Sequence, residues 1–203
     1  MKKILFIYFL FVILFVFQNC TKLQEQILDE TLSVKLTDQD AANGLIAPVY
    51  GKFTDIFTHT NYFALQEIST DEAILPYRGG TDWGDNGIYI ALHQHVMTST
   101  DPNVRSTWGH ILQGISRAVT AIDALPKLTS PNVKTYLAEA KAMYAYYSML
   151  TLDLWGLVFV KENPGNVSQI VRGAEAVNYI KKLFLESVND LDNTVGPGRL
   201  TQN

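Results

Sequence analysis

One long stretch of the chain, residues 69–100, lacks helical periodicity and gathers side chains that could hold a ligand. The aromatic, charged and amide side chains in its middle are Tyr77, Arg78, Asp82, Trp83 and Asn86. A pyranose ring has apolar C–H faces that rest on aromatic rings, and its hydroxyls pair with carboxylate, amide and guanidinium groups. The stretch therefore predicts a carbohydrate-contacting loop, with Trp83 or Tyr77 as the platform and the polar side chains as its rim. The alternative is that Trp83 is buried and that the acids cap turns.

The same stretch has a partial likeness to a calcium-binding loop. Asp82, Asn86 and Gly87 fall on positions one, five and six of the EF-hand pattern. Positions three and twelve are Gly84 and His93, where the pattern requires a carboxylate-type ligand and a glutamate. Because these two ligands are missing, the sequence predicts no calcium site.

The histidines do not have the spacing of a zinc site. None of the four, His59, His93, His95 and His110, belongs to an HExxH motif. Since Cys20 is the only cysteine, no mixed Cys/His ligand pattern is possible either. The sequence predicts no metal ion and no cofactor, and we interpret the histidines as core or loop residues.

The acidic residues offer only weak support for catalysis. Glu67, Asp71 and Glu72 could in principle form the carboxylate pair of a glycosidase, but neighbouring acids at a loop edge are more often caps or salt-bridge partners. The sequence contains no GxSxG, GxGxxG or GK[ST] motif. We therefore predict that the protein is not an enzyme.

The cysteine lies just after an apolar run near the start of the chain. Residues 4–17 are all apolar and follow Lys2 and Lys3, which is the pattern of a secretory signal. As a helix these 14 residues would reach about 21 Å, against a hydrocarbon core of about 30 Å, so the run is too short to span a bilayer comfortably. In bacterial lipoproteins the residue after such a run is an acylated cysteine. We predict a lipoprotein signal peptide at residues 1–19 and lipidation at Cys20; the alternative is an uncleaved anchor with an incidental cysteine.

The charge of the chain argues against a nucleic-acid partner. The formal net charge is −4, and removal of residues 1–19 with their two lysines would leave −6. Binding to phosphate backbones requires a basic surface, which this composition does not provide. After a polar and acidic tether at residues 20–36, the rest of the chain is long enough for one compact domain, residues 37–203.

The first helix of this domain is predicted to begin at Thr37. Thr37 has the residue type of an N-cap, and Asp38 and Asp40 place acids in the first turn. Pro48 and Gly51 interrupt the segment and are expected to kink or shorten it. The residues that recur every three or four positions, as on one face of a helix, are Leu45, Val49, Phe53 and Ile56.

Two further helices begin with similar residues. In TDPNVRSTW, Asp101 is the expected cap and Pro102 the first helical residue. In SPNVKTYL, Ser130 and Pro131 have the same roles, and Gly156 is expected to end that helix. Because the connection between them is short, the two helices should form an antiparallel pair. The apolar stripe of the first helix is Trp108, Ile111, Leu112, Ile115, Val119, Ile122 and Leu125.

A fourth helix is predicted from about Ala174 to Asp192. Helical hairpins stacked side by side are typical of tetratricopeptide-like folds, although the strict 34-residue signature is absent here. The sequence therefore predicts an all-α fold of tetratricopeptide-like hairpins with long irregular loops. The residues expected to face inward on the fourth helix are Val177, Ile180, Phe184, Val188 and Leu191.

Several segments together resemble the SusD/RagB-like nutrient-binding outer-membrane lipoproteins. The start CTKLQEQILDE and the segment TDQDAANGLIAPVYGKF are similar to that family's acylated start and first helix, and STDEA and GGTDWGDNG are similar to its next blocks. The most specific match is YLAEAKAMYAYYSMLTLDLWGLVFV, which resembles the family's AEA-containing helix and the strand after it. Tyr144 stands where the family often has arginine, and Val160 where it usually has proline.

The resemblance implies both a fold and a role. It implies the N-terminal portion of a SusD-like fold, truncated at the end of residues 37–203, since family members are normally more than twice this length. It also implies a non-catalytic lipoprotein, lipid-anchored and exposed at the outer membrane, that captures glycan or another nutrient for a SusC-like TonB-dependent transporter. The helices at 104–155 would then belong to the scaffold or the partner surface. The alternative is a helical module that contacts only the transporter and binds no glycan.

Overall fold

The computed structural model describes residues 36–80, 84–193 and 200. The predicted signal peptide, the lipidation site Cys20 and the tether up to residue 35 lie outside the described residues. Within the described part of the chain, no helix is both long enough and apolar enough to cross a membrane.

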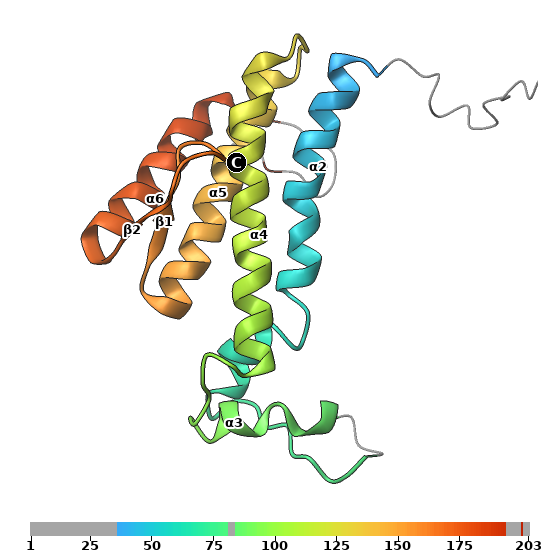
Figure 1. Cartoon of the computed structure of the whole chain (residues 1–203), viewed down its shortest axis with the longest axis vertical. Helices are drawn as coiled ribbons and strands as arrows, with labels where there is room; N and C mark the ends of the chain where they lie inside the picture. Colours follow the sequence, from blue (N-terminus) through green and yellow to red (C-terminus); the bar gives the residue numbers. More distant parts are fainter. Residues whose placement is uncertain (1–35, 81–83, 194–199, 201–203) are drawn as a thin grey trace, which may run out of the picture. The chain divides into compact units, whose positions relative to one another are not determined.

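Most of the described chain folds into long helices. They are α2 (Asp38–Ile56), α4 (Pro102–Ala124), α5 (Val133–Trp155) and α6 (Gly173–Ser187). Helix α4 packs against both α2 and α5, α2 also contacts α5, and α6 packs on α5 (Figure 1). Helices α4 and α5 run antiparallel, as Figure 1 shows. The prediction of an all-α fold built from helical hairpins is confirmed.

Short elements connect these helices. The described residues of 69–100, that is 69–80 and 84–100, are largely irregular, as predicted, and contain only a 3₁₀ turn and a single helical turn. After α5, the two strands of a small antiparallel hairpin pair Val158 with Val171. The short elements are η2 (Ala64–Ile68), η3 (Asp85–Gly87), α3 (Ile90–His93), η4 (Leu125–Lys127), β1 (Val158–Val160), β2 (Gln169–Val171) and η5 (Val188–Asp190).

Helix α2 begins at a capping box, which confirms Thr37 as its N-cap. Thr37 Oγ1 accepts a hydrogen bond from the Asp40 N–H (3.1 Å), and Asp40 Oδ2 accepts one from the Thr37 N–H (2.9 Å). The helix continues through Pro48 and Gly51 to Ile56, so the prediction that these residues shorten it is wrong. Burial of one face against α4 and α5 outweighs the cost of an interior proline, which is about 3 kcal/mol.

The start of α4 is confirmed at Pro102, but Asp101 does not cap it with its side chain. The Asp101 carboxylate instead turns back and accepts hydrogen bonds from the N–H and the hydroxyl of Thr98, the latter at 2.8 Å. These bonds from Thr98 hold the pKa of Asp101 below its usual value. The carboxylate thus fixes the turn at residues 98–101 that leads into the helix.

The start of α5 differs from the prediction. The helix begins at Val133, and Ser130 does not cap it. The Ser130 hydroxyl donates a hydrogen bond to Gln39 Oε1 on α2, and its oxygen accepts one from the Asn132 N–H (3.3 Å), so it fixes the turn before the helix. The predicted end is confirmed, because Gly156 terminates α5 in the left-handed conformation (φ 66°) and donates its N–H to the Leu152 carbonyl.

The core lies where α2, α4 and α5 meet, and Tyr147 of α5 connects all three helices. Gly114 of α4 allows the Tyr147 ring to approach, because a Cβ at position 114 would lie only 2.8 Å from a ring carbon. The Tyr147 hydroxyl donates a hydrogen bond to the carbonyl of Val49 on α2. One fully buried side chain therefore fixes the spacing of the three-helix core.

Helix α6 buries a different face from the predicted one. Ile180 is buried as expected, but Val177 is 53% exposed and Phe184 is 38% exposed. Val188, just after the helix, is 39% exposed. The prediction that these three residues face inward is wrong, because α5 is the long helix against which α6 packs, and it covers only one narrow stripe. The residues of α6 that are buried are Ala176, Ile180, Leu183 and Ser187.

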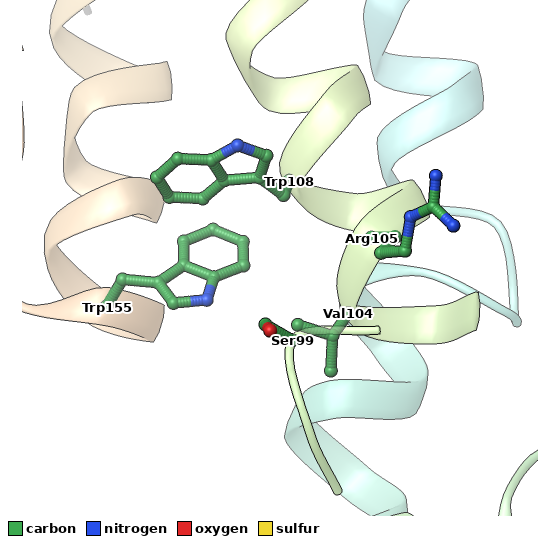
Figure 2. A pocket seen from close by; sticks show the side chains of 5 residues that line it. All are labelled: Ser99, Val104, Arg105, Trp108 and Trp155. Carbon is green, nitrogen blue, oxygen red and sulfur yellow. The ribbon is translucent and has the colours of Figure 1, made fainter. Parts of the chain in front are cut away.

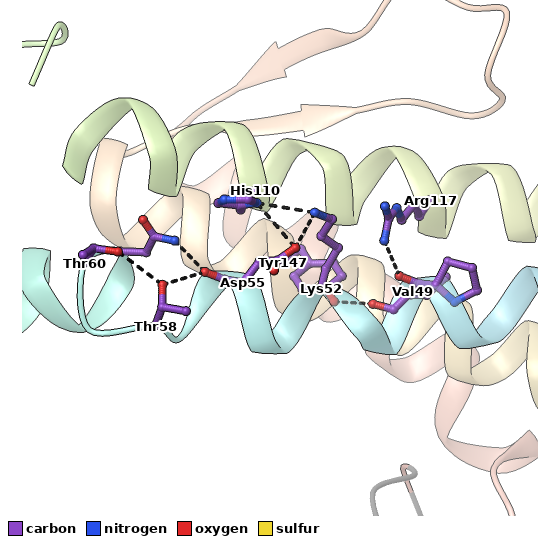
Figure 3. A network of polar contacts seen from close by, with 10 residues as sticks. Val49, Lys52, Asp55, Thr58, Thr60, His110, Arg117 and Tyr147 are labelled. Carbon is purple, nitrogen blue, oxygen red and sulfur yellow. Dashed lines mark hydrogen bonds and ion pairs between the residues drawn. The ribbon is translucent and has the colours of Figure 1, made fainter. Parts of the chain in front are cut away.

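A polar seam joins α2 to α4 (Figure 3). The buried Lys52 ammonium lies 2.6 Å from Asp55 Oδ2 and 3.4 Å from Nδ1 of His110 on α4. Further along the same two helices, Arg117 of α4 donates a hydrogen bond to the carbonyl of Pro48 on α2 (3.1 Å). The hydrogen bond from Lys52 holds the pKa of Asp55 below its ordinary value of 3.8. The stabilisation from this pair is therefore present above about pH 3.8 and is lost as the pH falls through the lowered pKa.

Candidate functional site

Only part of the predicted ligand-binding set lies in the described residues. Tyr77, Arg78 and Asn86 are described, and all three are exposed. Asp82 and Trp83 lie outside the described residues, so their positions stay a prediction.

Tyr77 packs on the turn that carries Asn86. A Cβ on Gly84 would lie 3.3 Å from a Tyr77 ring carbon, and a Cβ on Gly87 would lie 3.4 Å from another, so the ring rests against both glycines. Asn86 stands between them in the left-handed conformation (φ 59°), which asparagine tolerates better than most residues. Since Tyr77 keeps 41% of its surface exposed, the fold brings an accessible aromatic ring and an amide onto one loop surface.

The same turn is anchored by residues that the sequence did not single out. Asp85 Oδ2 accepts a hydrogen bond from the hydroxyl of the buried Tyr89 and lies 3.2 Å from His59 Nε2. His59 and Asp85 are 26 positions apart, so no local pattern marks them as a pair. The hydrogen bond from Tyr89, and then the one from His59, hold the pKa of Asp85 below its usual value. These three side chains fix the turn that presents Asn86.

A first prediction concerns this anchor. The Tyr89→Phe variant should raise the pKa of Asp85 toward its ordinary value of 3.8, because the largest contribution to its lowering is removed. Since the pKa of Asp85 is lower in the folded state, its contribution to holding the turn is lost as the pH falls through that pKa. In the variant this loss should begin at a higher pH. A titration of the Asp85 carboxyl carbon by NMR measures the shift, with Tyr62→Phe as a control, and an unchanged pKa would contradict the assigned contact.

A second candidate site lies between the start of α4 and the end of α5 (Figure 2). A cavity of about 480 Å³ opens there, lined by Ser99, Val104, Arg105, Trp108 and Trp155. The indole rings of Trp108 and Trp155 meet edge to face, with centroids 4.8 Å apart and planes at 86°. The sequence assigned Trp108 to the buried stripe of α4 and did not single out Trp155. Both rings are only partly buried. The sequence signal that could have identified Trp155 is its place directly before Gly156, the glycine that ends the helix.

The described residues offer no metal site, and the acids considered for catalysis lie at a turn. In residues 36–80, 84–193 and 200, no three side chains of His, Cys, Asp or Glu lie close enough together to hold a metal ion. The acids considered for catalysis border a turn in which the Thr70 hydroxyl donates to the Glu67 carbonyl (2.7 Å) and accepts from the Glu72 N–H (3.2 Å). Both hydrogen bonds join the Thr70 side chain to backbone groups, and they stabilise the turn.

The fold has clear counterparts among solved structures. A laminarin-binding SusD-like protein aligns with 82% of this chain at a TM-score of 0.70 and 19% identity. The surface glycan-binding protein A from Bacteroides fluxus aligns with 82% of it at 0.63 and 20% identity. A crystal structure with a xylogluco-oligosaccharide aligns with 80% of it at 0.63 and 19% identity. The chain has a SusD-like fold.

The SusD-like resemblance noted in the sequence is thus confirmed for the fold. The chain spans 38% of the length of the first two of these proteins and 32% of the third. No protein-family model matches the sequence. No curated protein matches it either.

In this SusD-like fold both candidate sites lie toward the same end of the α4–α5 hairpin. The loop with Tyr77 and Asn86 precedes α3, which lies beyond the start of α4 in Figure 1. The tryptophan cavity is built from the first turns of α4 and the last turn of α5. This end of the scaffold therefore carries the aromatic side chains of both candidate sites.

Proposed function

We propose that this chain is part of a non-catalytic, glycan-binding lipoprotein of the cell surface. The observation that carries the proposal is the SusD-like fold, shared at a TM-score of 0.70 with a protein that binds laminarin. Two further structures of the same fold come from a surface glycan-binding protein and from a crystal with a xylogluco-oligosaccharide. The ligand class common to these proteins is an oligosaccharide or polysaccharide, and we extend that class to this chain.

The proposed glycan contacts lie in the loop before α3. An aromatic ring covers the apolar face of a pyranose, and amide, carboxylate and guanidinium groups pair with its hydroxyls. Support comes from the exposed Tyr77 ring and the Asn86 amide, which share one surface on a turn anchored through Asp85. The proposed contact residues are Tyr77, Arg78, Asp82, Trp83 and Asn86.

We further propose that the protein is attached to the outer membrane through lipid on Cys20 and passes its glycan to a SusC-like TonB-dependent transporter. Both statements follow from the family resemblance of the sequence. In this arrangement the α4–α5 hairpin is scaffold or transporter-facing surface, and the loops hold the ligand. A binding protein of this kind needs affinity and orientation only, and the proposed contacts supply both without a reacting group.

A second prediction tests glycan binding. The protein should be retarded in native gels that contain laminarin or xyloglucan, and Trp83→Ala should weaken the affinity about tenfold, because an aromatic platform is lost. Trp83→Phe keeps a smaller aromatic face and should lose less. Phe63→Ala removes an aromatic side chain that is 49% exposed outside the loop and serves as the matched control. Equal mobility with and without every glycan tested would contradict the proposed function.

A third prediction separates this function from its alternative, a helical module that binds the transporter and no glycan. Both models predict that a TonB-dependent barrel co-purifies with the protein from detergent-solubilised outer membranes. Only the first predicts retention by polysaccharide, and neither predicts release of sugar from it.

The proposed lipidation is tested separately. Labelled palmitate should be incorporated into the protein and not into the Cys20→Ala variant; incorporation into both would contradict the lipidation site.

A further inference from the structure

The tryptophan cavity continues into a second one beside it. The neighbouring cavity, about 350 Å³, is lined partly by Leu65, Met97 and Leu154. Three residues, Ser99, Val104 and Trp155, line both cavities. Trp155 therefore stands at the junction of two adjoining hollows, which we call together the furrow at the start of α4. Each hollow falls within the size range of small-molecule sites, about 300–1,000 Å³.

The aromatic wall of this furrow is held in place by packing. Trp108 meets Trp155 edge to face, and it also meets the ring of Phe159 on β1 edge to face, with centroids 5.7 Å apart and planes at 72°. These contacts fix Trp108 between the end of α5 and the hairpin and leave Trp155 as the ring at the junction. A fixed, partly exposed indole loses little conformational entropy when it accepts a ligand.

Polar groups accompany the rings. In Figure 2 the indole N–H of Trp155 points toward the Ser99 side of the cavity, and among the described residues no acceptor pairs with it. Ser99 lies in the turn that the Asp101 carboxylate fixes through Thr98, so its position is set before any ligand binds. The Arg105 stem lines the cavity, and its guanidinium points away from the indole pair.

From this arrangement we infer that the furrow beside Trp155 is a second carbohydrate subsite, separate from the loop surface that contains Tyr77 and Asn86. Each hollow would take one pyranose unit of a neutral glycan, with the Trp155 ring between neighbouring units. The mixture of an aromatic face with an indole donor and a serine hydroxyl matches the alternating apolar and hydroxyl surface of a sugar ring. No carboxylate lines either hollow, so a cationic ligand has no counter-charge there. The inference rests on the proposed glycan-binding function.

The chain offers a direct optical test, because it contains only three tryptophans. In the full chain carrying Trp83→Phe, Trp108 and Trp155 are the only indoles left, and both line the furrow. Titration with laminarihexaose or a xyloglucan oligosaccharide should then give a saturable change in indole emission and should protect the indoles from acrylamide quenching. Trp155→Ala, with Trp83 intact, should weaken glycan affinity about tenfold, and Trp155→Phe should weaken it less.

The possible results distinguish failure of the second subsite from failure of the proposed glycan-binding function. If the wild-type protein binds glycan and Trp83→Phe shows no saturable change and no protection, the subsite is wrong and the proposed function stands. If the wild-type protein binds no glycan at all, both are wrong. Protection by an acyl-chain detergent monomer but not by sugar would assign the furrow to an apolar ligand and would also overturn the inference. The fluorescence readout does not depend on Trp155→Ala, so it decides the question even if that variant fails to fold.

Discussion

Gly114→Ala should lower the free energy of unfolding by about 2 kcal/mol, whereas Gly109→Ala in the same helix should raise it by about 0.5–1 kcal/mol. Both substitutions replace a glycine in α4 by the best helix former. The difference comes from the surroundings of the new methyl group. At position 114 it would lie 2.8 Å from a carbon of the Tyr147 ring, and at position 109 it would meet nothing within 4 Å.

Tyr147 cannot easily move away from a larger residue at position 114. Its ring is fully buried, and its hydroxyl is bound to the Val49 carbonyl on α2, so a shift would break that hydrogen bond or separate α4 from α5. Urea denaturation of the two single variants measures both effects, with circular dichroism to confirm unchanged helix content. Equal stabilisation by the two alanines would show that the helices do not approach as closely here as the packing indicates.

The close approach at Gly114 could not be predicted from the sequence, although much of the helical layout could. Helix limits follow from local chemistry: the Thr37 capping box, Pro102 at the first position and Gly156 at the end depend on residues within one turn. Ser130 shows where local chemistry stops being sufficient. Its hydroxyl donates a hydrogen bond to Gln39, a residue 91 positions earlier, and no sequence pattern near Ser130 predicts that partner.

The faces of the helices were harder to predict than their limits. On α6 the period of apolar residues correctly indicated a helix, but Val177 and Phe184 belong to a stripe that lies beside the one covered by α5. An amphipathic pattern shows how broad the apolar face is. Which part of that face is buried depends on the number and direction of neighbours, and α6 has one long helix against it.

The candidate sites likewise contain residues that the sequence predicted and residues that it did not. Composition alone drew attention to the loop with Tyr77 and Asn86, because aromatic and polar residues are crowded there without helical periodicity. The anchor through His59 and Asp85 depends on a contact between segments that only folding brings together. Trp155 was overlooked because it continues the apolar pattern of α5, and only its position at the open end of the hairpin makes it a candidate ligand contact.

Tyr144→Phe should lower the free energy of unfolding by about 2 kcal/mol, because one buried hydroxyl serves two backbone groups. The Tyr144 hydroxyl donates to the Phe159 carbonyl and accepts from the Lys161 N–H (2.9 Å), which fastens β1 and the residue after it to α5. The same position often carries arginine in the family that the sequence resembles, and here a tyrosine hydroxyl connects helix and hairpin instead. The variant should also speed hydrogen exchange of the Lys161 amide, since that donor loses its acceptor.

The matched control for this prediction is Tyr62→Phe, which removes a hydroxyl with a replaceable role. Tyr62 donates to Asp153 Oδ2 (3.0 Å), but that exposed carboxylate keeps its hydrogen bond from Gln66 (2.7 Å) and its contact with water. Its loss should therefore cost less than about 0.5 kcal/mol. If the two variants lose equal stability in chemical denaturation, or if exchange at Lys161 is unchanged in Tyr144→Phe, then Tyr144 does not hold the hairpin. In that case the position of Trp108, which packs against Phe159 of the same strand, would have to be maintained by α5 alone.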